Sequence, residues 1–118
     1  MEVTDFNINI TSSQSDVLTD WYANVLGLAS DEASGGFIVG GAHIFIDGHS
    51  ETSGATKEPH RVLINMSVDD LAAEQARLEA QGVTFIRKQG REDWGGVIST
   101  FLGPDGNYLQ MIEFKPGD

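Results

Sequence analysis

The chain carries one pattern twice, and this internal repeat limits the folds that are open to it. In each copy, an alternating apolar stretch is followed by a helical apolar stripe, a glycine and several short strand candidates. The two glycines, Gly27 and Gly82, lie about 55 positions apart, and the first strands of the two copies are offset by about the same distance. Because each half is too small to cover its own sheet, the two halves should pack together.

The first half has the pattern of a strand, a helix and a hairpin. Val3–Ile10 alternates apolar and polar residues, which predicts a strand with one face against a core. Ser13 with Asp16 resembles a capping box, and the apolar stripe that follows ends at Gly27, where a left-handed cap is expected. The later strand candidates of this half are 37–39 and 42–47, joined by a Gly-Gly turn.

The second half repeats this order. Arg61–Val68 alternates, Asp69 is placed to cap a helix, and Gly82 follows the end of that helix. A tight turn is predicted at 103–107, because proline fixes φ at the first corner and glycine takes the position with positive φ. The remaining predicted elements are a strand at 83–87, a charged loop at 88–92 and the strands 97–102 and 108–112 that flank the turn.

The segment 48–60 separates the two halves. It is polar and aperiodic, and its length is near the limit for a plain loop. It is either a mobile linker between two modules or a flap over a site, and we favour the linker.

Composition bounds the class of protein. With 118 residues we expect a single domain, 1–118, made of a first module at about 1–55 and a second at about 60–118. There is no cysteine, so disulfides, thiolate metal sites and thiol nucleophiles are excluded. The start of the sequence has no signal-peptide pattern and no apolar run is long enough to span a membrane, so we expect a cytoplasmic protein.

The net charge of −11 argues against nucleic acid and membranes as partners, since it repels phosphate groups. It would concentrate cationic small molecules near a cleft, although it also serves simply to keep the chain soluble.

Each helix must cover the apolar face of its own sheet. The sequence therefore predicts an α+β fold, in which two βαβββ modules form a curved, barrel-like mixed sheet with the helices outside. The opposite sheet faces would then line a binding cleft. They carry Asn7, Asn9, Leu63, Asn65, Tyr108 and Gln110.

Three segments carry a resemblance to a known family. They are 21–28 (WYANVLGL), 68–71 (VDDL) with the following Leu78 and Gly82-Val83, and 101–107 (FLGPDGN). In this order they resemble the vicinal oxygen chelate superfamily, the group of glyoxalase I, fosfomycin- and bleomycin-resistance proteins and extradiol dioxygenases. The resemblance covers essentially the whole chain and implies the fold described above. It implies much less about activity, because this fold hosts many chemistries.

The resemblance also places the metal ligands of the family on this chain. Its metal enzymes usually take His from the first strand of each module and Glu from the last, and the four positions fall on Asn7, Phe45, Leu63 and Gln110. Two amides and two hydrocarbon side chains are poor ligands for a divalent transition metal, so we expect no metal and no cofactor.

Other titratable residues are weaker candidates for such a site. His43 reaches the cleft only if the strand register is one residue off, and His49 and His60 lie in or beside the long loop. Asp47 and Glu113 would serve as general bases only if buried.

We therefore predict a metal-free protein that binds a small cationic or aromatic molecule, like the drug-binding members of the family. Trp94 is placed to stack on such a ligand or to pack at the rim, and the resemblance implies a homodimer. The alternatives are a lyase, isomerase or dioxygenase with a rearranged or absent metal site, and a scaffold without a ligand. The predicted cleft residues are Asn7, Asn9, Phe45, Leu63, Asn65, Trp94, Tyr108 and Gln110.

Overall fold

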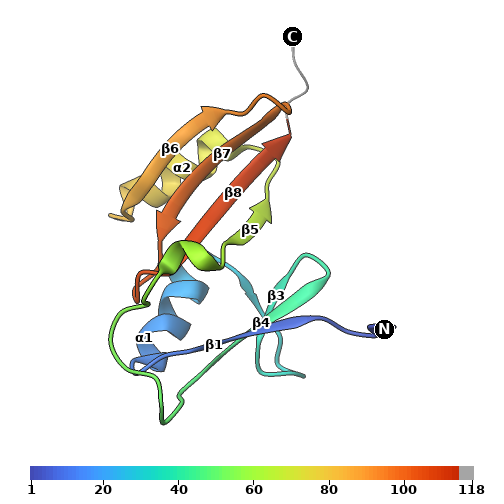
Figure 1. Cartoon of the computed structure of the whole chain (residues 1–118), viewed down its shortest axis with the longest axis vertical. Helices are drawn as coiled ribbons and strands as arrows, with labels where there is room; N and C mark the ends of the chain where they lie inside the picture. The colour runs from blue at the N-terminus through green and yellow to red at the C-terminus, as the bar shows by residue number, and fades with distance from the viewer. Residues whose placement is uncertain (115–118) are drawn as a thin grey trace. The chain divides into compact units, whose positions relative to one another are not determined.

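A computed structural model of the protein describes residues 1–114. The chain divides into two compact units, Met1–Ala55 and a second unit that begins at Thr56. Each unit contains a four-stranded mixed sheet and a main helix (Figure 1). The predicted α+β class is therefore confirmed, as is the repeated order of one strand, one helix and three strands. No helix within 1–114 has the length and hydropathy of a membrane span.

The first unit builds its sheet in the order β1-β4-β3-β2. β1 runs parallel to β4, whereas β3 is antiparallel to both β4 and β2. Helix α1 continues into a π-helical turn, and Gly27 follows it with φ of 77°, the left-handed conformation that glycine adopts without strain. The elements are β1 Asn7–Thr11, α1 Ser15–Asp20, the π-helical turn Trp21–Val25, β2 Ala29–Ser30, β3 Phe37–Val39 and β4 Ala42–Asp47.

The core of the first unit lies between α1 and one face of this sheet. Leu18 and Tyr22 come from the helical segment, and both are almost completely buried. The ring of Tyr22 stacks on Phe37 with 6.3 Å between the centroids. Ile10 and Ile44 are buried on the same side, so the predicted apolar stripe and the alternating strands meet as expected.

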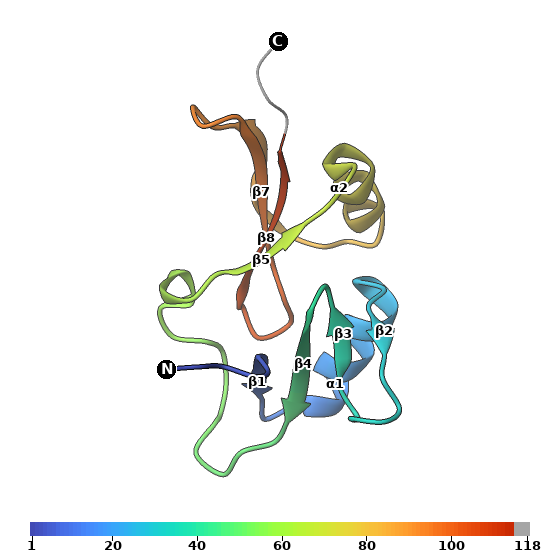
Figure 2. The same ribbon diagram turned by 90° about the vertical axis from the view of Figure 1, so that its right-hand side faces the viewer.

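The second unit repeats the topology in the order β5-β8-β7-β6, with β5 parallel to β8. Figure 2 shows this sheet nearly edge-on, with α2 on one side of it. The predicted turn lies between β7 and β8, where Gly106 has φ of 85° and the Gly103 amide donates to the Asn107 carbonyl at 3.0 Å. The elements are a 3₁₀ turn Pro59–Arg61, β5 Ile64–Ser67, α2 Leu71–Ala80, β6 Phe85–Arg91, β7 Gly96–Leu102 and β8 Tyr108–Phe114.

The core of the second unit forms where α2 packs on this sheet. Leu71 and Leu78 on α2 are 1% exposed, and Phe101 and Leu109 on the sheet are fully buried. Burying each such side chain stabilises the fold by about 1.5–3 kcal/mol. The helix thereby fixes which face of the sheet is covered.

Several predicted boundaries were wrong. β1 begins at Asn7 and not at Val3, and Phe6 before it is 61% exposed, so its side chain does not belong to the core. Gln14 precedes α1 without a side-chain cap, so the predicted capping box of Ser13 is absent. The second helix is capped by Asp70, one residue after the predicted Asp69. The carboxylate of Asp70 accepts a hydrogen bond from the backbone amide of Ala73 at 3.1 Å.

The segment 88–92, expected to be a charged loop, continues β6 through Arg91. The pairing of β6 with β7 shifts register twice between Phe85 and Gly90. At this irregularity the backbone amide of Gln89 donates a hydrogen bond to Oε1 of the buried Gln75 on α2, at 2.9 Å. An acceptor supplied by the helix thus stabilises a strand that the local sequence disfavours.

The segment 48–60 is attached at two points. The Thr52 hydroxyl lies 2.8 Å from the Thr11 hydroxyl on β1, and the Thr56 amide donates to the Asp105 carbonyl at 2.8 Å. Each bond holds the segment to the unit in which it lies, and the linker interpretation stays a prediction.

A glycine pair at the two ends of β3 tests the packing of the first unit. A Cβ on Gly36 would lie 2.8 Å from the Phe45 ring and 2.9 Å from the Ile44 carbonyl, whereas one on Gly41 would meet open space. We expect Gly36→Ala to lower the unfolding free energy by about 1–3 kcal/mol, and Gly41→Ala to leave it unchanged or raise it by about 0.4–1 kcal/mol. Urea denaturation measures both, and equal losses would contradict the packing described.

Candidate functional site

Each sheet has one face covered by the helix of its own unit and a second face that this helix leaves uncovered, which we call the open face. Residues paired in register on adjacent strands point to the same face, so the pairing assigns side chains to faces. In the second unit Leu109 and Phe101 pair beneath α2. Their neighbours Gln110 and Thr100 therefore belong to the open face.

The open face of the second sheet is arranged in rows that cross the strands. One polar row crosses β7, β8 and β5 and consists of Thr100, Gln110 and Asn65. The rows on either side of it are mostly apolar. They contain Ile98, Ile112 and Ser67 toward one end of the strands, and Leu102 and Tyr108 toward the other.

The polar row is joined by side-chain hydrogen bonds, and we call it the amide relay. The Thr100 hydroxyl donates to Oε1 of Gln110 at 2.9 Å. Nε2 of Gln110 then donates to Oδ1 of Asn65 at 2.8 Å. Thr100 is only 6% exposed, so its hydroxyl depends on Gln110, whereas Asn65 lies at the exposed end on the edge strand β5.

Aromatic residues lie at one end of this face. The indole of Trp94 lies over Gly96, in the space that a side chain at Gly96 would occupy. Gly96 pairs with Phe114, and the aromatic side chains of Trp94 and Phe114 are 56% and 65% exposed. On the neighbouring strand β6, the guanidinium of Arg87 lies over Gly90 of the same strand and forms an ion pair with Glu92 at 2.7 Å.

Two predicted residues lie at the opposite end. Tyr108 begins β8, and its ring centroid is 6.5 Å from that of His60. Leu63 was expected inside a strand but directly precedes β5, and it is 41% exposed.

The open face of the first sheet carries the other predicted residues. Asn9 pairs with Phe45 and Asn7 pairs with His43, which places all four on one face. Nδ2 of Asn9 donates to the carboxylate of Asp47 at 2.9 Å. The carboxylate of Asp47 therefore accepts from an amide. Its side chain is exposed, so it lacks the burial that a general base was expected to have.

Sequence reasoning misjudged His43. It was expected to need a shifted register, but it lies two residues before Phe45 and shares its face without any shift. The period-two alternation of the strand already contained this signal. Nε2 of His43 lies 3.1 Å from Oδ2 of Asp31, a partner from the loop before β3 that the sequence did not single out.

The pKa of Asp31, in the loop before β3, is shifted. The Ser34 hydroxyl donates to its carboxylate at 2.8 Å, and this bond, helped by His43 and the Ala33 amide, holds the pKa of Asp31 below its ordinary value of 3.8. The carboxylate is therefore stabilised in its charged form.

The four positions that correspond to metal ligands do not fit a divalent metal. Both polar atoms of Gln110 are engaged in the amide relay, and Phe45 and Leu63 have no lone pair to donate. Asn7 offers a single amide, which lies 3.5 Å from Asp5. In neither unit do three or more His, Cys, Asp or Glu residues of 1–114 group together as a metal site would require.

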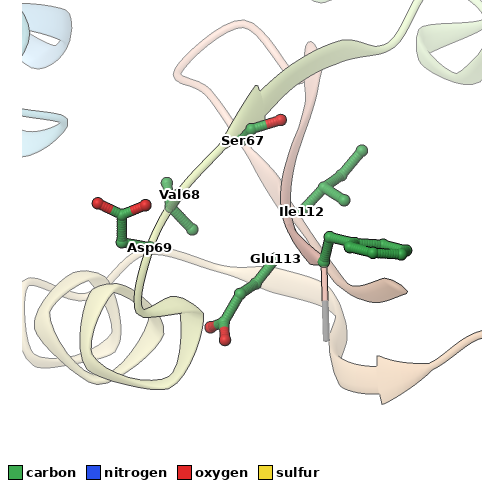
Figure 3. Close-up of a pocket in the computed structure, with 6 residues that line it drawn as sticks. Ser67, Val68, Asp69, Ile112 and Glu113 are labelled. Atoms are coloured by element: carbon green, nitrogen blue, oxygen red, sulfur yellow. The ribbon is translucent and has the colours of Figure 1, made fainter. Parts of the chain in front are cut away.

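A hollow of about 310 Å³ adjoins the open face of the second sheet (Figure 3). Its lining includes Ser67 and Ile112, which belong to the open face, together with Asp69 and Glu113. Oε1 of Glu113 accepts from the Leu71 amide at 2.8 Å, so this carboxylate serves the start of α2 and is not placed as a general base. A second hollow of about 230 Å³ lies between 56–62 and Asn107.

Comparison with known proteins agrees with this architecture. The family model described as the Glyoxalase/Bleomycin resistance protein/Dioxygenase superfamily matches residues 7–111. A structure of a glyoxalase/bleomycin resistance protein/dioxygenase family enzyme from Burkholderia phytofirmans PsJN is 20% identical, with a TM-score of 0.74 over 92% of this chain and 96% of that chain.

Two further solved structures show the same likeness. An integron cassette protein from the mobile metagenome of V. cholerae is 20% identical, with a TM-score of 0.71 over 98% of both chains. A lactoylglutathione lyase from Agrobacterium tumefaciens is 17% identical, with a TM-score of 0.71 over 95% of this chain and 94% of that chain. At such identities these likenesses show the fold alone. No curated protein matches the chain.

The amide relay can be tested by a double-mutant cycle. Gln110→Leu leaves the buried Thr100 hydroxyl without a partner and should lower the unfolding free energy by about 1–3 kcal/mol. Thr100→Val removes that hydroxyl, so the double variant should lose less than the sum of the two single variants. Urea denaturation gives all four free energies. Additivity within about 0.3 kcal/mol would show that the two residues do not interact.

The acidity of Asp31 predicts a pH effect with a definite sign. Because its pKa in the folded protein is below the ordinary value, its contribution to stability is present above that value and is lost as the pH falls through the folded pKa. Ser34→Ala should raise the pKa of Asp31 and weaken this contribution, whereas Ser53→Ala in an exposed loop should not. An NMR titration of the Asp31 carboxyl carbon between about pH 2 and 6 measures the shift. An unchanged pKa in Ser34→Ala would contradict the assigned cause.

Proposed function

The chain belongs to the Glyoxalase/Bleomycin resistance protein/Dioxygenase superfamily, and from that membership we propose that it is a small-molecule-binding protein that works without a divalent metal. The ligand lies on the open face of the second sheet. The observation that carries this proposal is the amide relay, which crosses three strands between rows of apolar side chains.

The amide relay is unusual for a face with only a structural role. Polar groups taken out of water are costly unless they are hydrogen-bonded, so an apolar row would be the simpler way to fill this face. Here a buried hydroxyl, a half-buried amide and an exposed amide are ordered into one line. Together with the exposed ring of Trp94, they supply the mixture of apolar surface and few placed polar groups that is typical of ligand sites.

Binding without a metal follows from the side chains at the ligand positions. An amide with both atoms engaged and two hydrocarbon side chains cannot replace the imidazole and carboxylate ligands of the family's metal enzymes. The chemistry that depends on such a metal is therefore not proposed for this chain.

The alternative function is a lyase, isomerase or dioxygenase of the same superfamily with a rearranged or absent metal site. One observation favours it: His43 lies on the open face of the first sheet and is oriented by Asp31, as a general base would be. The two proposals differ in what purification should recover, because a rearranged metal enzyme retains a stoichiometric ion.

Further predictions accompany the binding function. We propose that the two modules act as one domain, that the protein is a cytoplasmic homodimer, and that it binds neither nucleic acid nor membranes. The net charge of −11 supports the last point, since it opposes association with phosphate groups.

Metal analysis and thermal unfolding test the proposal together. We expect less than about 0.1 equivalent of nickel, zinc, iron or manganese in the purified protein, because the ligand positions do not bind them. A screen of aromatic metabolites should give hits whose effect is the same with and without EDTA. A ligand at a hundred times its dissociation constant adds about 2.7 kcal/mol to the unfolding free energy. Stoichiometric metal, or hits that require a metal, would favour the enzyme instead.

A further inference from the structure

The amide relay has a direction, and this direction decides which polar group it presents to a ligand. At its buried end the Thr100 hydroxyl carries a single hydrogen, which it donates to Gln110. Gln110 therefore accepts this hydrogen bond through its side-chain oxygen, and its side-chain nitrogen donates a second one to Oδ1 of Asn65. The nitrogen of Asn65 is left facing outward from the relay.

The opposite direction would leave one buried hydrogen without an acceptor. If both amides were turned over, Gln110 would donate to Thr100, and the hydrogen of the Thr100 hydroxyl would need another acceptor. Within residues 1–114 the side chain of Thr100 bonds only to Gln110. Because a buried hydroxyl hydrogen without an acceptor is costly, the burial of Thr100 favours the observed direction of the whole row.

Asn65 therefore presents an NH₂ group whose hydrogens are not used by the described part of the chain. The equivalent residue of the first module differs. Asn9 pairs with Phe45 as Asn65 pairs with Gln110, but the nitrogen of Asn9 already donates to Asp47. Of the two repeated asparagines, only Asn65 keeps both hydrogens of its NH₂ group for a ligand, because Asn9 gives one of its two to Asp47.

The surroundings of Asn65 favour a neutral or anionic acceptor over a cation. No carboxylate lies in the rows of the open face described above. Of the two carboxylates that line the adjoining hollow, Glu113 serves the start of α2, and Asp69 lies beyond the end of β5, four residues after Asn65. Arg87 on β6, the opposite edge strand of this sheet, is neutralised by its ion pair with Glu92. The cationic ligand expected from the net charge of −11 thus finds no partner at this position.

Apolar surface adjoins the donor. The row of Ile98 and Ile112 lies next to the amide relay, and the exposed rings of Trp94 and Phe114 lie one row further along. Rows on one face of a strand are about 7 Å apart. A flat ring system of two fused rings would cover the isoleucine row while its polar substituent reaches Asn65.

We propose that the open face of the second sheet binds a planar apolar molecule through an acceptor oxygen, a ketone carbonyl or a carboxylate, which receives a hydrogen bond from Nδ2 of Asn65. This inference rests on the proposed binding function and specifies the ligand class for the same face.

Three probes with one ring system test the ligand class. They are 2-acetylnaphthalene with a neutral acceptor, 2-naphthoate with a charged acceptor, and 2-naphthylmethylammonium with donors only. Titrations followed by ¹H–¹⁵N NMR should show that the ketone binds at least about tenfold more tightly than the ammonium probe and shifts the side-chain NH₂ signals of Asn65. 2-Naphthoate should also bind more tightly than the ammonium probe, and weaker binding than that probe would contradict a carboxylate as the acceptor.

An isosteric variant inverts the proposed donor. Asn65→Asp keeps an oxygen for Gln110 but replaces the outward NH₂ group with an acceptor, so the ketone should lose about tenfold in affinity and the ammonium probe should gain. Gln81→Glu at the end of α2 adds the same charge away from this face and should change neither affinity by more than about twofold. Urea denaturation of Asn65→Asp confirms that the variant is folded.

The outcomes separate the inference from the function on which it rests. Equal or tighter binding of the ammonium probe to the wild-type protein, or an unchanged order of affinities in Asn65→Asp, would overturn the acceptor specificity while ligand binding stands. If none of the three probes shifts any signal of β5, β7 or β8, the binding function itself fails, and the inference fails with it.

Discussion

The parallel pairing of the first and last strands in each unit is the constraint on which the rest depends. β1 lies beside β4 and β5 beside β8, although each pair is far apart in sequence. A parallel connection cannot be made by a tight turn, so the chain must cross over, and it does so through a helix. That helix covers one face of the sheet and leaves the other face to carry function. The same pairing places Asn65 next to Gln110.

Much of this architecture can be predicted from the sequence because it depends on local signals. The turn at 103–107, the glycine after each helix and the alternation in β5 and β8 each act within a few residues. Alternation alone was sufficient to place Asn65 and Gln110 on one face. The β6 boundary could not be predicted in this way, because a buried glutamine of α2 stabilises that strand from a distance.

The candidate site shows the same division between local and long-range causes. The residue types were visible in the sequence, but their bonding was not. The direction of the amide relay depends on how deeply Thr100 is buried, and the place of Trp94 depends on a glycine across a turn. His43 was misplaced for a simpler reason. The alternation of its own strand already puts it on the same face as Phe45, and this alternation was not applied to it.

The irregular pairing of β6 has a consequence for the behaviour of the protein in solution. β6 lies at the edge of its sheet, where unpaired backbone groups can recruit strands from other molecules. The register shifts, the bond from Gln89 back to α2 and the charged side chains of Arg87 and Lys88 together make this edge a poor template. The irregular pairing of β6, which made its boundary unpredictable from the sequence, therefore also opposes aggregation through this edge.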